Sequence, residues 1–227
     1  LVLLAAVGFK CLISIDDVYY EGIDSITLTD ILYAEELGYG IKLLAIGRHV
    51  SDNDYSFKVH PTLIPLDHPL CGIHDETNAV CVYGDAVGDA LLAGKGAGSE
   101  PTASAVVSDM IDLAFDIDQP RTRRNLEPNL NSVTCLPMDK SYSQFYLRLF
   151  LKDEVGALEH VTHALKESGL SVAQLVQKGV HDAQAELVIV TQSCYEYTFQ
   201  SAKTALENLV VVTSLASYIR VRSRENA

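Results

Sequence analysis

The chain has 227 residues, which is room for one large domain or two ordinary ones. Hydrophobic residues make up 48% of it, enough to form real cores and to argue against disorder. The formal net charge of −13 argues against a nucleic-acid partner and against binding to an anionic membrane surface. The cysteines are odd in number and scattered without a C-x-x-C pair, a pattern typical of reduced thiols in a cytoplasmic protein: Cys11, Cys71, Cys81, Cys135 and Cys194.

The chain opens on an apolar run, residues 1–9, that ends at Lys10. This run is far shorter than the roughly 20 residues that a membrane span needs, and it lacks the basic residues that begin a signal peptide. We interpret it as an internal helix, and we therefore expect the chain to be a piece of a longer protein.

Acidic residues surround Tyr19 and Tyr20 in the next stretch. Clustered carboxylates can bind a metal or do acid–base chemistry, but the lack of His or Cys among them favours a solvated loop. A helix follows, capped by Thr27 or Thr29 and ended by Gly38. The carboxylates concerned are Asp16, Asp17, Glu21 and Asp24.

Three strands are predicted next, and their short separations favour an antiparallel or mixed sheet. They span residues 41–46, 55–60 and 78–84, and the second is expected to end at Pro61. Histidines interspersed with prolines either form a metal site or are ordinary loop histidines, and we favour the second: His60, His68 and His74.

A glycine-rich turn, residues 94–98, leads into a helix of small residues expected over about 101–115. Gly96 and Gly98 have no Cβ, so a ligand can approach the backbone closely. Pro101 suits a first helical turn, where free N–H groups and the helix dipole attract anions such as phosphate. The alternative is a plain glycine turn before a buried helix, since a lone G-x-G is weak evidence.

Prolines, asparagines and a basic run at 121–124 predict a linker over residues 118–141. From residue 142 to the end, hydrophobic periodicity predicts strands and helices in the order βαββαβ. Such an order folds as a ferredoxin-like unit with four antiparallel strands and both helices on one face. The fold class is therefore α+β, with a mixed-sheet region followed by this unit. His160 and His163 share a face of its first helix and are interpreted as surface residues.

Residues 1–117 resemble the C-terminal half of the catalytic region of the homoserine dehydrogenase family. The motifs, taken together and in order, are highly specific for that family. They are EGI at 21–23, ELGY at 36–39 with IKLLAI at 41–46, VHPTLIP at 59–65, NAV at 78–80, GDAVG at 84–88 and GAGxxPTASAV at 96–106.

Residues 142–227 resemble an ACT domain, a regulatory module that binds amino acids. The signature is DEVGAL at 153–158, where Val155 replaces the usual proline, and Thr191–Gln192 stands where Thr-His is common. The resemblance implies that a small amino acid, with threonine as the first candidate, binds as an effector where this turn meets a strand of a partner ACT domain. The implied effector-binding residues are Asp153, Val155, Gly156, Ala157 and Leu158.

The resemblance to homoserine dehydrogenases implies interconversion of aspartate semialdehyde and homoserine with NAD or NADP. It implies that the catalytic lysines and the Rossmann half lie upstream of residue 1, so this chain alone is expected to be inactive. It also implies a homodimer, and cofactor contacts at the turn. Glu100 there would repel a phosphate and suits a ribose, a nicotinamide amide or solvent. The implied cofactor-binding residues are Gly96, Gly98, Pro101 and Thr102.

Two alternatives stay open. One is a dimeric amino-acid-sensing module that acts as a binding protein, with the first region as a scaffold. The other is a related oxidoreductase acting on a different β-hydroxy or semialdehyde substrate, since the residues expected to select the substrate lie outside this chain. We predict no metal site.

Overall fold

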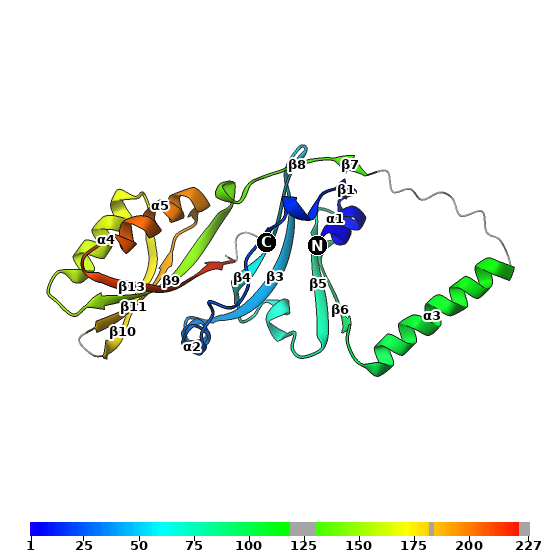
Figure 1. Ribbon diagram of the computed structural model, residues 1–227, viewed down its shortest axis with the longest axis horizontal. Coiled ribbons are helices and arrows are strands. Elements are labelled where there is room, and N and C mark those ends of the chain that lie inside the picture. The colour runs from blue at the N-terminus through cyan, green and yellow to red at the C-terminus, as the bar shows by residue number, and fades with distance from the viewer. Residues whose placement is uncertain (119–129, 182–183, 223–227) are drawn as a thin grey trace. The chain divides into compact units, whose positions relative to one another are not determined.

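Figure 1 shows the computed structural model of the chain, which describes residues 1–118, 130–181 and 184–222. The chain forms two compact units. The first joins Leu1–Pro65 to the chain from Leu130 onward, and the second is formed by the chain between them. The expected basic run at 121–124 lies outside the described residues.

The first unit begins with several short elements, which are followed by the helix α2. The Thr27 side chain accepts from the backbone N–H of Asp30, and Asp30 in turn accepts from the N–H of Thr27. This reciprocal capping box confirms Thr27 as the residue before the helix. The elements are α1 (Val2–Gly8), β1 (Cys11–Leu12), a 3-10 turn (Ile15–Asp17), β2 (Tyr19–Tyr20) and α2 (Leu28–Glu36).

A long antiparallel hairpin follows, made of β3 (Tyr39–Ser51) and β4 (Asp54–Pro65). The predicted end of the second strand at Pro61 is wrong, because β4 continues through that proline to Pro65. On its other side β4 pairs with β2 at Lys58 and Val59, and with the last strand from Thr62. Pro61 lies between these two pairings, where its missing N–H removes no ladder hydrogen bond on that side.

The part of the expected linker that the structure describes pairs with this region. β7 (Asn131–Ser132) pairs with β1, and β8 (Thr134–Cys135) pairs with β4, both in parallel. A 3-10 turn (Met138–Lys140) then leads into the next strand.

The chain from residue 142 forms the predicted βαββαβ unit. Its strands are antiparallel and run in the order β10–β11–β9–β13, which is the ferredoxin-like topology. Helices α4 and α5 cover one face of this sheet (Figure 1). The elements are β9 (Tyr142–Lys152), α4 (Ala157–Glu167), β10 (Val172–His181), β11 (Gln184–Thr191), β12 (Cys194–Tyr195), α5 (Glu196–Glu207) and β13 (Val212–Val221).

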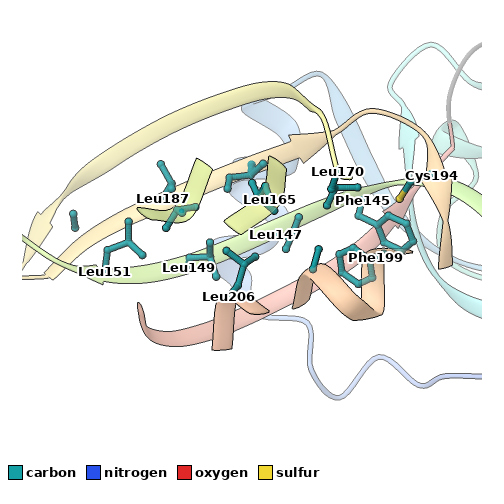
Figure 2. Packing of buried hydrophobic residues seen from close by; sticks show 14 residues of the cluster. Phe145, Leu147, Leu149, Leu151, Leu165, Leu170, Leu187, Cys194, Phe199 and Leu206 are labelled. Atoms are coloured by element: carbon teal, nitrogen blue, oxygen red, sulfur yellow. The ribbon is translucent and has the colours of Figure 1, made fainter. Parts of the chain in front are cut away.

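The two faces of the ferredoxin-like sheet are buried by different partners. Under α4 and α5 lies a cluster that includes Leu147, Leu165 and Leu187, in which the rings of Phe145 and Phe199 stack 3.8 Å apart (Figure 2). The other cluster holds Tyr146, Val188 and Ile219 with Ala34 of α2 and Leu63 of β4. Helix α2 of the N-terminal segment therefore packs on the sheet face opposite α4 and α5.

The second unit contains a short 3-10 turn (Pro69–Gly72), the hairpin β5 (Thr77–Gly84) and β6 (Gly88–Lys95), and the helix α3 (Ser99–Asp118). The strand predicted at 78–84 is β5, and a strand that was not predicted, β6, stands between it and the glycine turn. The helix itself is confirmed, but none of its described residues is buried. None of the described helices is long and apolar enough to cross a bilayer.

Candidate functional site

The glycine turn lies between β6 and α3. Gly98 has φ +115°, a conformation that suits glycine, and a Cβ on Gly96 would collide with the Asn78 side chain. The N–H of Gly96 donates to the Glu76 carbonyl (3.2 Å), and that of Thr102 donates to the Gly98 carbonyl (3.2 Å). The turn itself therefore favours glycine at Gly98, and at Gly96 a larger residue would displace the Asn78 side chain; the surface that both glycines leave bare is exposed backbone.

A second turn, Asp153–Gly156, joins β9 to α4. Gly156 precedes the helix with φ +90°, and no side chain caps this end. Val155 is fully exposed and Leu158 is 41% exposed, while Ala157 is buried. The turn therefore presents two apolar side chains to solvent beside an uncapped helix end.

A buried cluster of polar side chains lies on the α2 side of the sheet, centred on Arg148 of β9. Its Nε donates to Asp30 Oδ1 at 2.8 Å, its Nη1 to Glu186 Oε1 at 3.1 Å and its Nη2 to Thr27 Oγ1 at 3.1 Å. The Ser217 hydroxyl also donates to Asp30 Oδ1 at 2.5 Å. Burial opposes ionisation of Asp30, but hydrogen bonds from Arg148, Ser217 and Thr27 hold its pKa below the usual value.

A matching cluster lies on the α5 side, centred on Arg220 of β13. Its Nη2 donates to Glu196 Oε1 at 2.7 Å, and its Nη1 donates to Glu21 Oε2 at 2.7 Å. The Tyr19 hydroxyl donates to the same Glu21 oxygen at 3.1 Å. The predicted solvated acidic loop is therefore wrong at Glu21, because Arg220 binds it.

Lys58 and His60 of β4 lie beside Arg220. Burial, reinforced by the Arg220 charge, lowers the pKa of Lys58 to about 8 and that of His60 to about 3. The Lys58 ammonium donates to Ser141 Oγ at 2.5 Å. His60 Nδ1 lies 3.0 Å from the Thr62 hydroxyl, and its Nε2 is buried without a hydrogen-bond partner among the described residues.

The other sequence candidates have separate local contacts. His68 bonds the Tyr83 hydroxyl at 2.9 Å within the second unit, and His60 belongs to the first unit. Asp17 caps the short 3-10 turn together with Ser14. In the described ranges, no three side chains of His, Cys, Asp or Glu gather as metal ligands do.

Neither arginine cluster was predicted from the sequence. Arg148 meets Asp30 across 118 positions of sequence, and Arg220 meets Glu21 across 199. The available signal was an arginine at a core position of an otherwise apolar strand, which requires a buried partner.

Comparison with known proteins places these features in a family. The homoserine dehydrogenase family model matches residues 1–111. The chain is 40% identical to homoserine dehydrogenase of Neisseria gonorrhoeae over 97% of this chain and 52% of that protein. It is 38% identical to that of Bacillus subtilis over 96% and 51%. The crystal structure of a homoserine dehydrogenase from Thiobacillus denitrificans superposes with a TM-score of 0.86 and 36% identity, covering 98% of this chain and 51% of that one.

An α+β chain that joins a mixed sheet to a ferredoxin-like unit thus superposes, over nearly its whole length, on part of a known dehydrogenase. The chain belongs to the homoserine dehydrogenase family. It spans about half the length of the curated relatives it matches.

Proposed function

We propose that the chain is part of an oxidoreductase that interconverts L-aspartate 4-semialdehyde and L-homoserine with NAD or NADP. The observation that carries this proposal is the match over 97% of the chain to a curated homoserine dehydrogenase. Residues 1–117 are the catalytic and dimerisation part, 118–141 a linker and 142–227 an ACT regulatory domain. The full protein is a cytoplasmic homodimer.

The turn at Gly96–Thr102 is the proposed contact with the cofactor, which supplies the hydride chemistry when bound. Its exposed backbone fits this role, because no side chain extends from Gly96 or Gly98. Glu100 in the first turn of α3 disfavours a phosphate there and favours a ribose or nicotinamide amide. We assign no catalytic residue to this chain.

We further propose that the turn at 153–158 takes the carboxylate of a threonine effector. Three features support this: the uncapped end of α4, the left-handed Gly156, and the exposed Val155 and Leu158, which a partner strand would cover. The ferredoxin-like topology is the fold expected for an ACT domain.

Calorimetric titration tests the effector. Threonine should bind saturably, and isoleucine, methionine and lysine should not. On this proposal the Asp153 carboxylate accepts from the ammonium group of threonine, and Asp153→Asn in the turn should weaken binding by about tenfold, because the neutral amide makes a weaker hydrogen bond to that cation. Asp139→Asn, the same change outside the turn, should bind threonine like the parent chain. Equal affinity for threonine in both variants would show that the turn is not part of the effector site.

The enzymatic half of the proposal is tested by following NAD(P)H with homoserine as substrate. The full-length protein should turn over, and the 227-residue chain alone should not. Activity in the isolated chain would contradict the assignment of the catalytic groups to other parts of the enzyme. An inactive full-length protein that still binds threonine would favour the amino-acid-sensing alternative.

A further inference from the structure

The loop Gly22–Ile26, which joins β2 to α2, is bound at both ends by the two buried arginines. Just before it, Glu21 accepts from Arg220 at 2.7 Å. Just after it, the Thr27 hydroxyl accepts from Arg148 at 3.1 Å. Both arginines lie on neighbouring strands of the ferredoxin-like sheet, β13 and β9.

Each arginine also binds a carboxylate of the ferredoxin-like unit itself. Arg148 contacts Glu186 of β11, and Arg220 contacts Glu196 at the start of α5. The Arg148 guanidinium therefore joins one end of the loop to β11, and the Arg220 guanidinium joins the other end to the start of α5. The planar guanidinium serves two carboxylates at once, which a lysine ammonium does not reproduce.

The two arginines act on opposite faces of the sheet. Arg148 shares its face with Tyr146 and the α2 cluster, whereas Arg220 pairs with Phe145, whose ring lies under α5. A shift or twist of β9 against β13 therefore moves the two loop ends differently.

Ile26 at the end of the loop packs, partly buried, against the α2-side cluster, and the rest of the loop has little to fix its position. Residues Gly22, Ile23, Asp24 and Ser25 are exposed. The backbone hydrogen bonds at its ends run from Glu21 N–H to the Val59 carbonyl and from Ile26 N–H to the Ile23 carbonyl.

We propose that Arg148 and Arg220 are positioning residues that set the loop Gly22–Ile26 from the ferredoxin-like sheet. A ligand that shifts the strands of this sheet thereby also shifts the loop, which lies in the segment that the family model matches. The arginine contacts stand on geometry alone, and only the identity of the ligand, threonine, rests on the proposed function. Coupling of this kind runs through contiguous buried contacts.

Hydrogen exchange in Glu21→Gln tests the positioning. This change weakens the bond from the loop to Arg220 and leaves Glu196 in place. We expect the amides of Glu21 and Ile26 to exchange about tenfold faster than in the parent chain, as a local opening. The amides of Leu147 and Leu149 in β9 should exchange at the parent rate, which a general loss of stability would not allow.

Glu207→Gln is the matched control, because its ion pair with Lys203 joins two positions of α5 and does not reach the loop. It should leave loop exchange unchanged. Arg220→Lys keeps the charge and should still speed exchange at Glu21. Parent-like exchange at Glu21 and Ile26 in Glu21→Gln, or equal acceleration at Leu147, would overturn the proposal.

Adding threonine separates the two proposals. Binding that alters exchange at Glu21 and Ile26 in the parent chain, and less so in Glu21→Gln, supports transmission to the loop. Binding with no change at these amides refutes it. If no threonine binds, the effector assignment fails, and the comparison of variants without ligand still decides whether the arginines position the loop.

Discussion

His60 shows at the scale of one residue how burial makes stability depend on pH. Its folded pKa is about 3, against 6.5 for an ordinary histidine, because burial and the nearby Arg220 disfavour its charged form. Between these two values the unfolded chain binds more protons than the folded one. Folding stability contributed at this site is therefore lost as pH falls from about 6.5 towards 3, with a slope of at most about 1.4 kcal/mol per pH unit.

Urea unfolding at pH 7, 5.5 and 4 measures this loss. His60→Asn should flatten the dependence on pH over that range, because the titrating ring is gone. His74→Asn, at an exposed histidine, should keep the slope of the parent chain. An unchanged slope in His60→Asn would show that other groups govern acid sensitivity.

Single residues were also where the sequence was least informative. Thr27 was one of the two caps predicted, Thr27 or Thr29, because a capping partner is only three positions away. The N-terminal partners of the two arginines, Asp30 for Arg148 and Glu21 for Arg220, are more than 100 positions away, and no local pattern marks such pairs. Glu21 looked like a solvated carboxylate for the same reason.

Helix α5 carries one aromatic side chain into the core and one into solvent, two residues apart. Phe199 is fully buried and stacks on Phe145, whereas Tyr197 is 57% exposed and stacks on Tyr195. Phe199→Ala should cost about 3–5 kcal/mol of unfolding free energy, because it leaves a cavity in the core of Figure 2. Tyr197→Ala should cost about 0.5 kcal/mol.

Chemical denaturation of the two variants measures the difference. Similar losses in both would mean that the stacked pair at the centre of the cluster does not dominate the packing of α5. The spacing that predicted this helix, with Phe199, Ala202 and Leu206 on one face, is the same spacing that places them in the core.

Elements with a strong hydrophobic periodicity were predicted from the sequence. Elements whose existence or extent depends on the strands that pair with them were not. The order βαββαβ followed from alternating strands and striped helices. Strand β6, whose residues are nearly all exposed, has no alternating burial to detect. Strand β4 passes through Pro61 because two different neighbours pair on either side of it.

For the whole molecule, the fold class was predictable and the joining of its parts was not. Strand β13 pairs in parallel with β4 through Arg220–Thr62 and Val221–Leu63, so the ferredoxin-like sheet continues into the N-terminal sheet. The two strands lie in regions that the sequence presents as separate, one on each side of the glycine turn. The proposed linker and domain limits therefore stay a prediction.

The hairpin β5–β6 supports the proposed homodimer, because this two-stranded sheet exposes apolar side chains. They include Val80, Val82, Leu91 and Leu92. Two-stranded sheets are marginal alone, and closed two-fold pairing is the commonest way to bury such a surface. Light scattering should give twice the 24.8 kDa of one chain. Leu92→Arg should lower this mass towards the monomer, whereas Leu66→Arg, outside the hairpin, should not. A monomeric parent chain at working concentration would contradict the dimer, and a Leu92→Arg variant that stays dimeric would move the interface elsewhere.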